Sequence, residues 1–343
     1  MRASLRCALL LCILAVAPLP GQQTPAPLVR FLRQSIGLDT AQVAAVERGV
    51  AVVKVLGTKN QRDVAVFGII TMDVPRATYI GHLQDFPSSL RTPTRARFGI
   101  FSDPATAADV QDLVVDPQDV PEVKDCHPND CKIKLPATAM KRLHEEIDWS
   151  AADAHAQVNA YARQRLVEYV NDYRTRGDTA MVVYDNRGNV RASSAFAALL
   201  SESPYVYEYI PSFHNYLATY PRGKLDGLRE VLFWSEDRLP RLKPILSVTH
   251  LAVYAPPELP MMTVVAGKQI YANHYFEAGL DLTTVVDRPT AANPGIYLML
   301  LRRSRFDDLP TGLFNIRGKV IGKLRDQMLV DLDREKATAE QLR

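Results

Sequence analysis

The sequence predicts an α+β fold in which a curved antiparallel sheet grips a long C-terminal amphipathic helix. Four blocks rich in β-branched and aromatic residues lie between residues 228 and 306, and the breaks "RLPRLKP", "PPELP" and "RPTAANP" separate them. Such breaks are typical of an antiparallel meander. The last segment is expected to be a helix that packs on the sheet, because apolar residues recur there at steps of three or four: Leu313, Ile316, Val320, Leu324, Met328 and Leu332.

Shorter elements are expected before the meander. Residues 38–49 should form a helix that Asp39 or Thr40 caps and Gly49 ends. The runs "GVAVVKVLG" and "DVAVFGIITMDV" predict a hairpin around the polar turn "TKNQR". The segment "PRATYIGHLQDF" predicts a helix that starts at Pro75, and "RARFGIFSD" and "CKIKLP" predict further strands.

A mainly helical segment, residues 137–228, separates these elements from the meander. "ATAMKRLHEEI" predicts one helix, and the stretch that ends at Gly177 predicts a longer one with Ser150 as its cap. "TAMVVYDNRGNV" predicts a strand and a turn. "SAFAALLSE" and "PYVYEYIPSFHNYLATYP" are expected to be helical despite Pro211.

The third block of the meander, residues 263–286, is too long for one flat strand. A straight strand of this length would extend over about 79 Å at 3.3 Å per residue. The block must therefore bend, at a bulge near Gly267 or Gly279, or split in two. As a single strand it would place His274 in an apolar row facing the interior, and a polar row on the outer face: Tyr271, Tyr275, Glu277 and Asp281.

The order of helix, hairpin, short helix, curved sheet and long C-terminal helix resembles the helix-grip fold of START-like (SRPBCC) proteins. The residues that carry the resemblance lie in 45–136 and 229–343, from "GVAVVKVLG" to "GIYLMLLRRSRF" and the last helix. The resemblance implies a START-like domain split between 22–136 and 229–343, with 137–228 as a helical insertion. It also implies a cavity between the sheet and the C-terminal helix that binds an apolar small molecule, such as a lipid.

Four residues are candidates for contacting such a ligand: His274, Phe276, Trp234 and Arg302. His274 could bind a ligand carbonyl or act as an acid or base, and the alternative is a core histidine whose hydrogen bonds are satisfied by its neighbours. Arg302 could orient a ligand, pair with an acid such as Glu277, or lie at an exposed strand end. Trp234 is expected in the core or in a cavity wall.

Motifs for covalent catalysis and for nucleotide cofactors are absent from the sequence. Neither G-x-S-x-G nor S-x-x-K occurs, and neither do the phosphate-binding motifs G-x-x-x-x-G-K-[ST] and G-x-G-x-x-G. The zinc motif H-E-x-x-H is also absent, although His144, Asp148 and His155 lie close together in the sequence. We therefore expect no cofactor and no metal, and the catalytic residues of any reaction are unknown.

Residues 1–21 predict a signal peptide. Arg2 and Arg6 precede an apolar stretch of about ten residues, which is too short to span a bilayer, and a cleavage site precedes Gln22. The mature chain is expected in the periplasm or outside the cell, unless the leader is kept as an anchor. No later segment is apolar enough to span a membrane, and a formal net charge of +3 gives no argument for nucleic-acid binding.

Two cysteines follow the predicted leader, Cys126 and Cys131 in "DCHPNDCKIKLP". In an oxidising compartment this spacing favours a local disulfide. Because the closed loop is short, its stabilisation is expected at the low end of the usual ~2–4 kcal/mol. The alternative is a metal site that includes His127, but zinc would require a second ligand pair, which is not visible.

Three functions stay open on the sequence. The first is an exported protein that binds an apolar ligand between the sheet and the C-terminal helix. The second is an enzyme of the same fold that uses His274 as acid or base, with Glu277 as its partner. The third is an envelope protein that docks through residues 137–228. The sequence does not indicate an oligomeric state.

Overall fold

The computed structural model describes residues 26–289, 294–309 and 315–342, so the predicted signal peptide and Leu313 lie outside the described residues. Its centre is an antiparallel sheet in the order β1-β2-β10-β9-β8-β7-β6-β3. The strands are β1 (Val52–Leu56), β2 (Asp63–Met72), β3 (Arg95–Ile100), β6 (Arg229–Asp237), β7 (Ile245–Tyr254), β8 (Met262–Ala272), β9 (Phe276–Arg288) and β10 (Gly295–Phe306).

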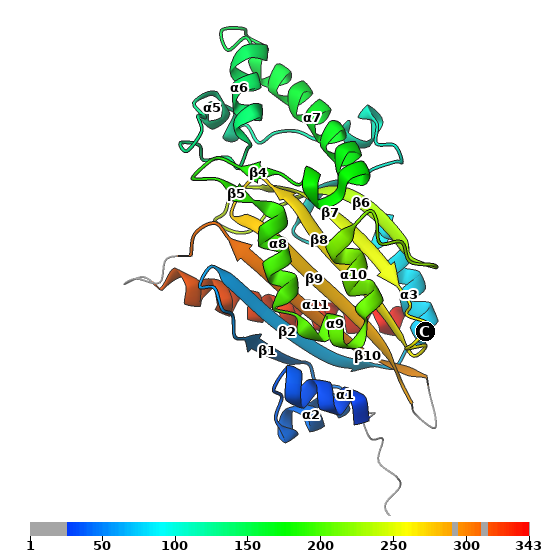
Figure 1. The fold of residues 1–343 in the computed structure, drawn as a ribbon. Helices are drawn as coiled ribbons and strands as arrows, with labels where there is room; N and C mark the ends of the chain where they lie inside the picture. The colour runs from blue at the N-terminus through cyan, green and yellow to red at the C-terminus, as the bar shows by residue number, and fades with distance from the viewer. Residues whose placement is uncertain (1–25, 290–293, 310–314, 343) are drawn as a thin grey trace, which may run out of the picture.

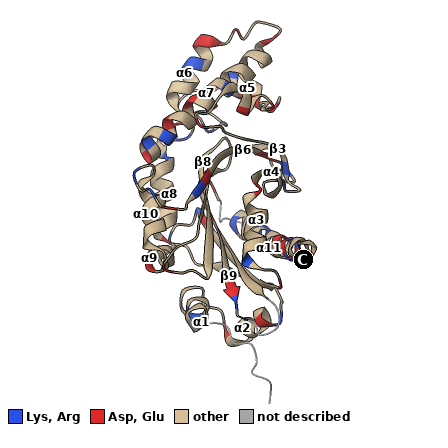
Figure 2. Ribbon diagram, turned by 90° about the vertical axis from the view of Figure 1, so that its right-hand side faces the viewer, with Lys and Arg blue, Asp and Glu red and all other residues tan. Residues whose placement is uncertain are grey.

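Helices cover both faces of this sheet (Figures 1 and 2). One face carries α11 (Ile316–Gln341) and α3 (Arg76–Gln84), and the other carries α8 (Ala192–Ser201), α9 (Pro204–Tyr209) and α10 (Pro211–Thr219). The remaining helices are α1 (Ala26–Arg30), which continues into a π-helical turn (Phe31–Ser35), α2 (Thr40–Glu47), α4 (Phe86–Ser89), α5 (Asp119–Lys124), α6 (Ala137–Glu146) and α7 (Ala154–Arg176). The α+β class, the large antiparallel sheet and the C-terminal helix are confirmed.

The helix α11 packs on β2 and β10 through side chains predicted from its spacing. Met328 and Leu332 of α11 are fully buried in one cluster with residues of β2 and β10, among them Val66, Ile70 and Leu298. Gly68 of β2 permits this close approach, because a Cβ atom there would lie 2.8 Å from Cγ of Met328. The part of the sheet nearest to α11 is therefore filled by side chains.

A larger apolar core lies on the other face of the sheet. It joins Phe196 of α8 and Phe213 of α10 to Ile270 of β8 and Met299 of β10. The predicted insertion 137–228 thus shares a core with the sheet through its second half. In its first half, α6 and the start of α7 form a separate small cluster around Cys126 and Cys131, at the top of Figure 1. The second half of α7 belongs to the larger core.

The third block of the meander is two strands, β8 and β9, that form a hairpin. The single bent strand is therefore wrong, and the split is confirmed. Asn273–Tyr275 make the turn, in which Tyr275 has the left-handed φ of 62° and the amide of Phe276 donates to the carbonyl of His274 at 2.7 Å. Because of this turn, Ile270 and Phe276 belong to the cores on opposite faces of the sheet.

Two other local predictions need correction. "CKIKLP" is not a strand, since the Lys134 amide makes one bond to the Asn273 carbonyl at 2.9 Å before Pro136 leads into α6. Ser150 does not cap α7, because its hydroxyl donates to Asp148 at 2.6 Å and the helix starts later, at Ala154. The predicted Asp39 cap of α2 is present, in a capping box with Gln42.

We expect Gly68→Val to lower the free energy of unfolding by about 1–3 kcal/mol, because its side chain must displace Met328 and Leu332. Urea unfolding followed by circular dichroism measures this. Gly322→Ala on α11 is the control, because a Cβ atom there meets nothing within 4 Å. This substitution should stabilise the helix by ~0.5–1 kcal/mol. A Gly68→Val protein as stable as the wild type would contradict the close packing of α11 on β2.

Candidate ligand-binding site

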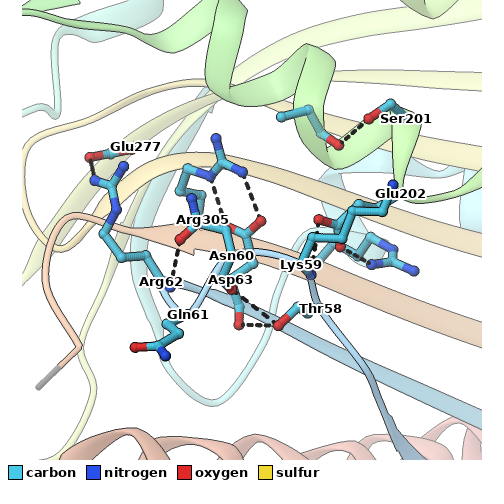
Figure 3. Close-up of polar contacts among 12 residues, drawn as sticks. Thr58, Lys59, Asn60, Gln61, Arg62, Asp63, Ser201, Glu202, Glu277 and Arg305 are labelled. Carbon is cyan, nitrogen blue, oxygen red and sulfur yellow. Dashed lines mark hydrogen bonds and ion pairs between the residues drawn. The ribbon is translucent and has the colours of Figure 1, made fainter. Parts of the chain in front are cut away.

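His274 lies at the tip of the β8–β9 hairpin and is 5% exposed. Its Nε2 atom is 2.9 Å from Oδ2 of Asp119, the first residue of α5. Glu277, its predicted acid partner, instead forms an ion pair with Arg62 (Figure 3). The structure therefore gives His274 and Glu277 different partners, which does not favour the hypothesis that they act together as acid and base.

Asp119 connects three segments at this end of the sheet. Besides His274 it accepts a hydrogen bond from Lys243 Nζ at 2.9 Å, and Lys243 lies in the link between β6 and β7. Burial alone would raise the pKa of Asp119, but hydrogen bonds and charges from His274 and Lys243 outweigh it, so the pKa is lowered. The carboxylate is ionised and fixes the hairpin tip to α5.

The other three predicted residues lie apart from His274. Arg302 points to the α11 side, where it donates to Oδ2 of Asp331 at 2.7 Å. Phe276 packs against Phe306 at a ring distance of 4.8 Å, also in the α11 cluster. Trp234 is 1% exposed, and its Nε1 atom donates to the Asp109 carbonyl at 2.8 Å. The structure does not bring the four residues into one site.

An apolar cavity of about 310 Å³ lies on the face of the sheet opposite α11. Its floor consists of side chains from β2, β8, β9 and β10, and its walls come from the first helical residues and from α9. The lining includes Phe31, Phe67, Tyr209, Leu282, Met299 and Leu301. None of the lining residues in the described part of the chain is charged, so the cavity suits a hydrocarbon group.

Aromatic rings hold the walls of this cavity together. Phe31 contacts Phe67 of β2 and Tyr205 and Tyr209 of α9 edge to face, with ring centroids 6.1, 5.5 and 6.0 Å apart. Such contacts stabilise a pair by ~0.5–1.5 kcal/mol beyond the area that they bury. The π-helical turn and α9 are thus linked to each other and to the sheet across the cavity.

A second cavity of about 450 Å³ lies between α6, α7 and the ends of β7 and β8. Its lining mixes apolar residues with charged ones, and Asp119 and Asn273 lie at its edge beside His274. Arg165 and Glu168 on its wall already form an ion pair at 2.8 Å. The charged side chains in its lining make this cavity less suitable for a hydrocarbon than the first one.

Cys126 and Cys131 lie at disulfide distance, with Cα atoms 4.5 Å apart. Within the residues that the structure describes, no group of three or more His, Cys, Asp or Glu side chains is placed to hold a metal ion. His144, a predicted metal candidate, is hydrogen-bonded through Nε2 to the Cys126 carbonyl at 2.8 Å. In residues 26–289, 294–309 and 315–342, no helix is both long and apolar enough to cross a bilayer.

No protein-family model matches the sequence, and no curated protein sequence matches it. Among solved structures, the ZhuI aromatase/cyclase from Streptomyces sp. R1128 is 10% identical, with a TM-score of 0.22 over 44% of this chain and 87% of that one. The di-domain ARO/CYC StfQ from the steffimycin biosynthetic pathway is 15% identical, with a TM-score of 0.21 over 56% of this chain and 61% of that one. These likenesses are coarse, and the description of the fold rests on the sheet order and on α11.

We expect Asp119→Asn to lower the free energy of unfolding by about 1–3 kcal/mol at pH 7. The substitution removes the negative charge of Asp119 and so weakens its hydrogen bonds with His274 and Lys243. The folded-state pKa of Asp119 lies below its ordinary value of 3.8. Its contribution is therefore complete above that pH and is lost as the pH falls through the folded-state pKa.

Urea unfolding between about pH 7 and about pH 2 measures this dependence. The difference between the wild type and Asp119→Asn should shrink on acidification. Asp125→Asn, at the exposed end of the same helix, is the control and should change little at any pH. A constant difference across this range would show that the charge of Asp119 is not what stabilises the hairpin tip.

Proposed function

We propose that this protein binds an apolar small molecule, such as a lipid chain, in the cavity between the sheet and α9. The observation that carries the proposal is the uncharged lining of that cavity, about 310 Å³ in volume. Ligand pockets are typically concave, mostly apolar and of roughly 300–1,000 Å³. The site lies on the opposite face of the sheet from the one predicted, because α11 fills the predicted space with Met328 and Leu332.

The driving force would be removal of hydrocarbon from water. Each buried CH₂ group contributes ~0.8 kcal/mol, which is about a fourfold change in affinity. Affinity should therefore rise with chain length until the cavity is filled and then level off. Thr284, Tyr205 and Tyr209 supply the hydroxyl groups of the lining, so specificity would come mainly from shape and from the groups beyond the cavity.

We expect Leu282→Phe to weaken binding of Nile red and of C8–C14 alcohols by about tenfold. The phenyl ring would occupy space that the ligand needs, and the lost contacts would reduce the binding free energy by ~1.4 kcal/mol. Leu282 lines the cavity from β9. Leu300→Phe on β10 is the matched control because Leu300 packs on the α11 side, and its binding should stay within about twofold.

Fluorescence titration with Nile red, and its displacement by the alcohols, measures both variants. If Leu300→Phe weakens binding and Leu282→Phe does not, the ligand lies on the α11 side. If wild-type protein binds neither Nile red nor any alcohol, the proposed function is wrong.

We also propose that the mature chain is exported after loss of residues 1–21. The Cys126–Cys131 pair at disulfide distance supports this, because such bonds persist in oxidising compartments. Intact-mass analysis of protein from the extracytoplasmic fraction should give a chain that starts at Gln22, with no thiol labelled until a reductant is added. Full-length protein with two free thiols in the cytoplasm would contradict the proposal.

A further inference from the structure

A polar pocket of about 460 Å³ adjoins the apolar cavity. It lies between β1, the π-helical turn and the link from α8 to α9, and Tyr205 lines both spaces. Arg303, Glu202 and Lys54 supply charge to this pocket. The apolar cavity therefore opens beside a charged site that was not predicted from the sequence.

Strand β10 connects the two spaces. Leu301 lines the apolar cavity, and Arg303 lines the polar pocket. Side chains two residues apart on a strand share a face and lie ~6.6 Å apart. A ligand whose chain lies over Leu301 can thus place its first polar group beside the guanidinium of Arg303.

Arg303 has hydrogen-bonding capacity left over. It is 4% exposed, its Nη1 atom is 3.3 Å from Oε2 of Glu202, and its buried Nε atom has no hydrogen-bond partner. A buried donor without an acceptor is unfavourable by ~1–3 kcal/mol. An acceptor oxygen delivered to the Nε edge would remove this cost.

The charges of the pocket are compatible with an anionic group. Glu202 is already engaged, since it also accepts a hydrogen bond from the Lys59 amide at 3.3 Å (Figure 3), and Glu208 is exposed. Lys54 adds a second positive charge, held by the Gly37 carbonyl. A carboxylate is, with phosphate, one of the two common anionic groups whose oxygens match the planar edge of a guanidinium.

We propose that the ligand is a single-chain amphiphile with a carboxylate head group. Its hydrocarbon chain occupies the apolar cavity, and its carboxylate accepts a hydrogen bond from Nε of Arg303. This inference rests on the proposed function, since it needs the chain to bind in that cavity. The carboxylate is bound as the free anion, and no covalent step is involved.

The test compares dodecanoate with dodecanol on the full chain at pH 8, by displacement of Nile red. Wild-type protein should bind dodecanoate about tenfold or more tightly than dodecanol, as expected for charge-assisted hydrogen bonds. Arg303→Met should lower the affinity for dodecanoate to that for dodecanol and leave dodecanol and Nile red within about twofold. Equal binding of the two ligands by the wild type would overturn the inference while the proposed function stands.

Two further variants separate the role of Arg303 from a loss of folding or of charge. The double variant Arg303→Met with Glu202→Gln removes both members of the ion pair. It should lose the preference for dodecanoate over dodecanol to the same extent as Arg303→Met. Arg305→Met is the control, because Arg305 lies on the same strand but pairs bidentately with Asp63 at 2.7 Å, and it should retain the preference. Retained preference in the double variant, or its loss in Arg305→Met, would assign the head group elsewhere. Failure of all proteins to bind dodecanol and Nile red would instead remove the proposed function itself.

Discussion

Strands β2 and β10 are covered on both faces, and the positions of the other layers follow from this. Every residue of β2 from Asp63 to Met72 is buried, so its even-numbered and odd-numbered side chains both need apolar partners. On one side α11 supplies them at close range over Gly68. On the other side the contacts come from short helices and aromatic rings, which fill space less completely. The cavity lies on that second side for this reason.

The parts of the fold that follow from local pattern could be predicted. The β1–β2 hairpin, the meander, the Asp39 cap and α11 all have strong periodicity or capping chemistry. The β8–β9 hairpin lacked such a signal, because its turn contains neither Gly nor Pro and Tyr275 takes the left-handed conformation. Contacts of Asn273 with distant residues, such as the Leu246 amide at 2.8 Å, stabilise the turn instead.

The candidate site could not be predicted, because alternation along a strand does not tell which face will hold a cavity when both faces are covered. Arg302 and Arg303 are adjacent, and the sequence favoured the first. In the structure Arg302 is satisfied by Asp331 on α11, whereas Arg303 lines the polar pocket beside the cavity, with an unpartnered Nε atom. The cavity walls also come from segments far apart in sequence, from Leu28 to Leu301, which no local pattern relates.

Buried polar contacts explain how the cavity keeps its shape. Lys268 of β8 pairs with Asp178 and donates to the Leu217 carbonyl of α10 at 3.2 Å. His250 of β7 contacts the hydroxyls of Tyr173 and Tyr216 at 3.1 and 3.0 Å. Burial lowers the pKa of His250 although Glu230 lies nearby, and the imidazole is therefore neutral. Buried polar groups of this kind require specific partners and so fix the orientation of helices.

The helix α9 lies between α8 and α10, which these contacts and the apolar core hold on the sheet. It therefore lies across the cavity between two fixed ends instead of collapsing into it. A protein whose cavity exists before binding loses little conformational entropy when a ligand enters. Even modest apolar contacts can then give measurable affinity. The polar network would thus help to keep the apolar cavity open for the proposed ligand without contacting it.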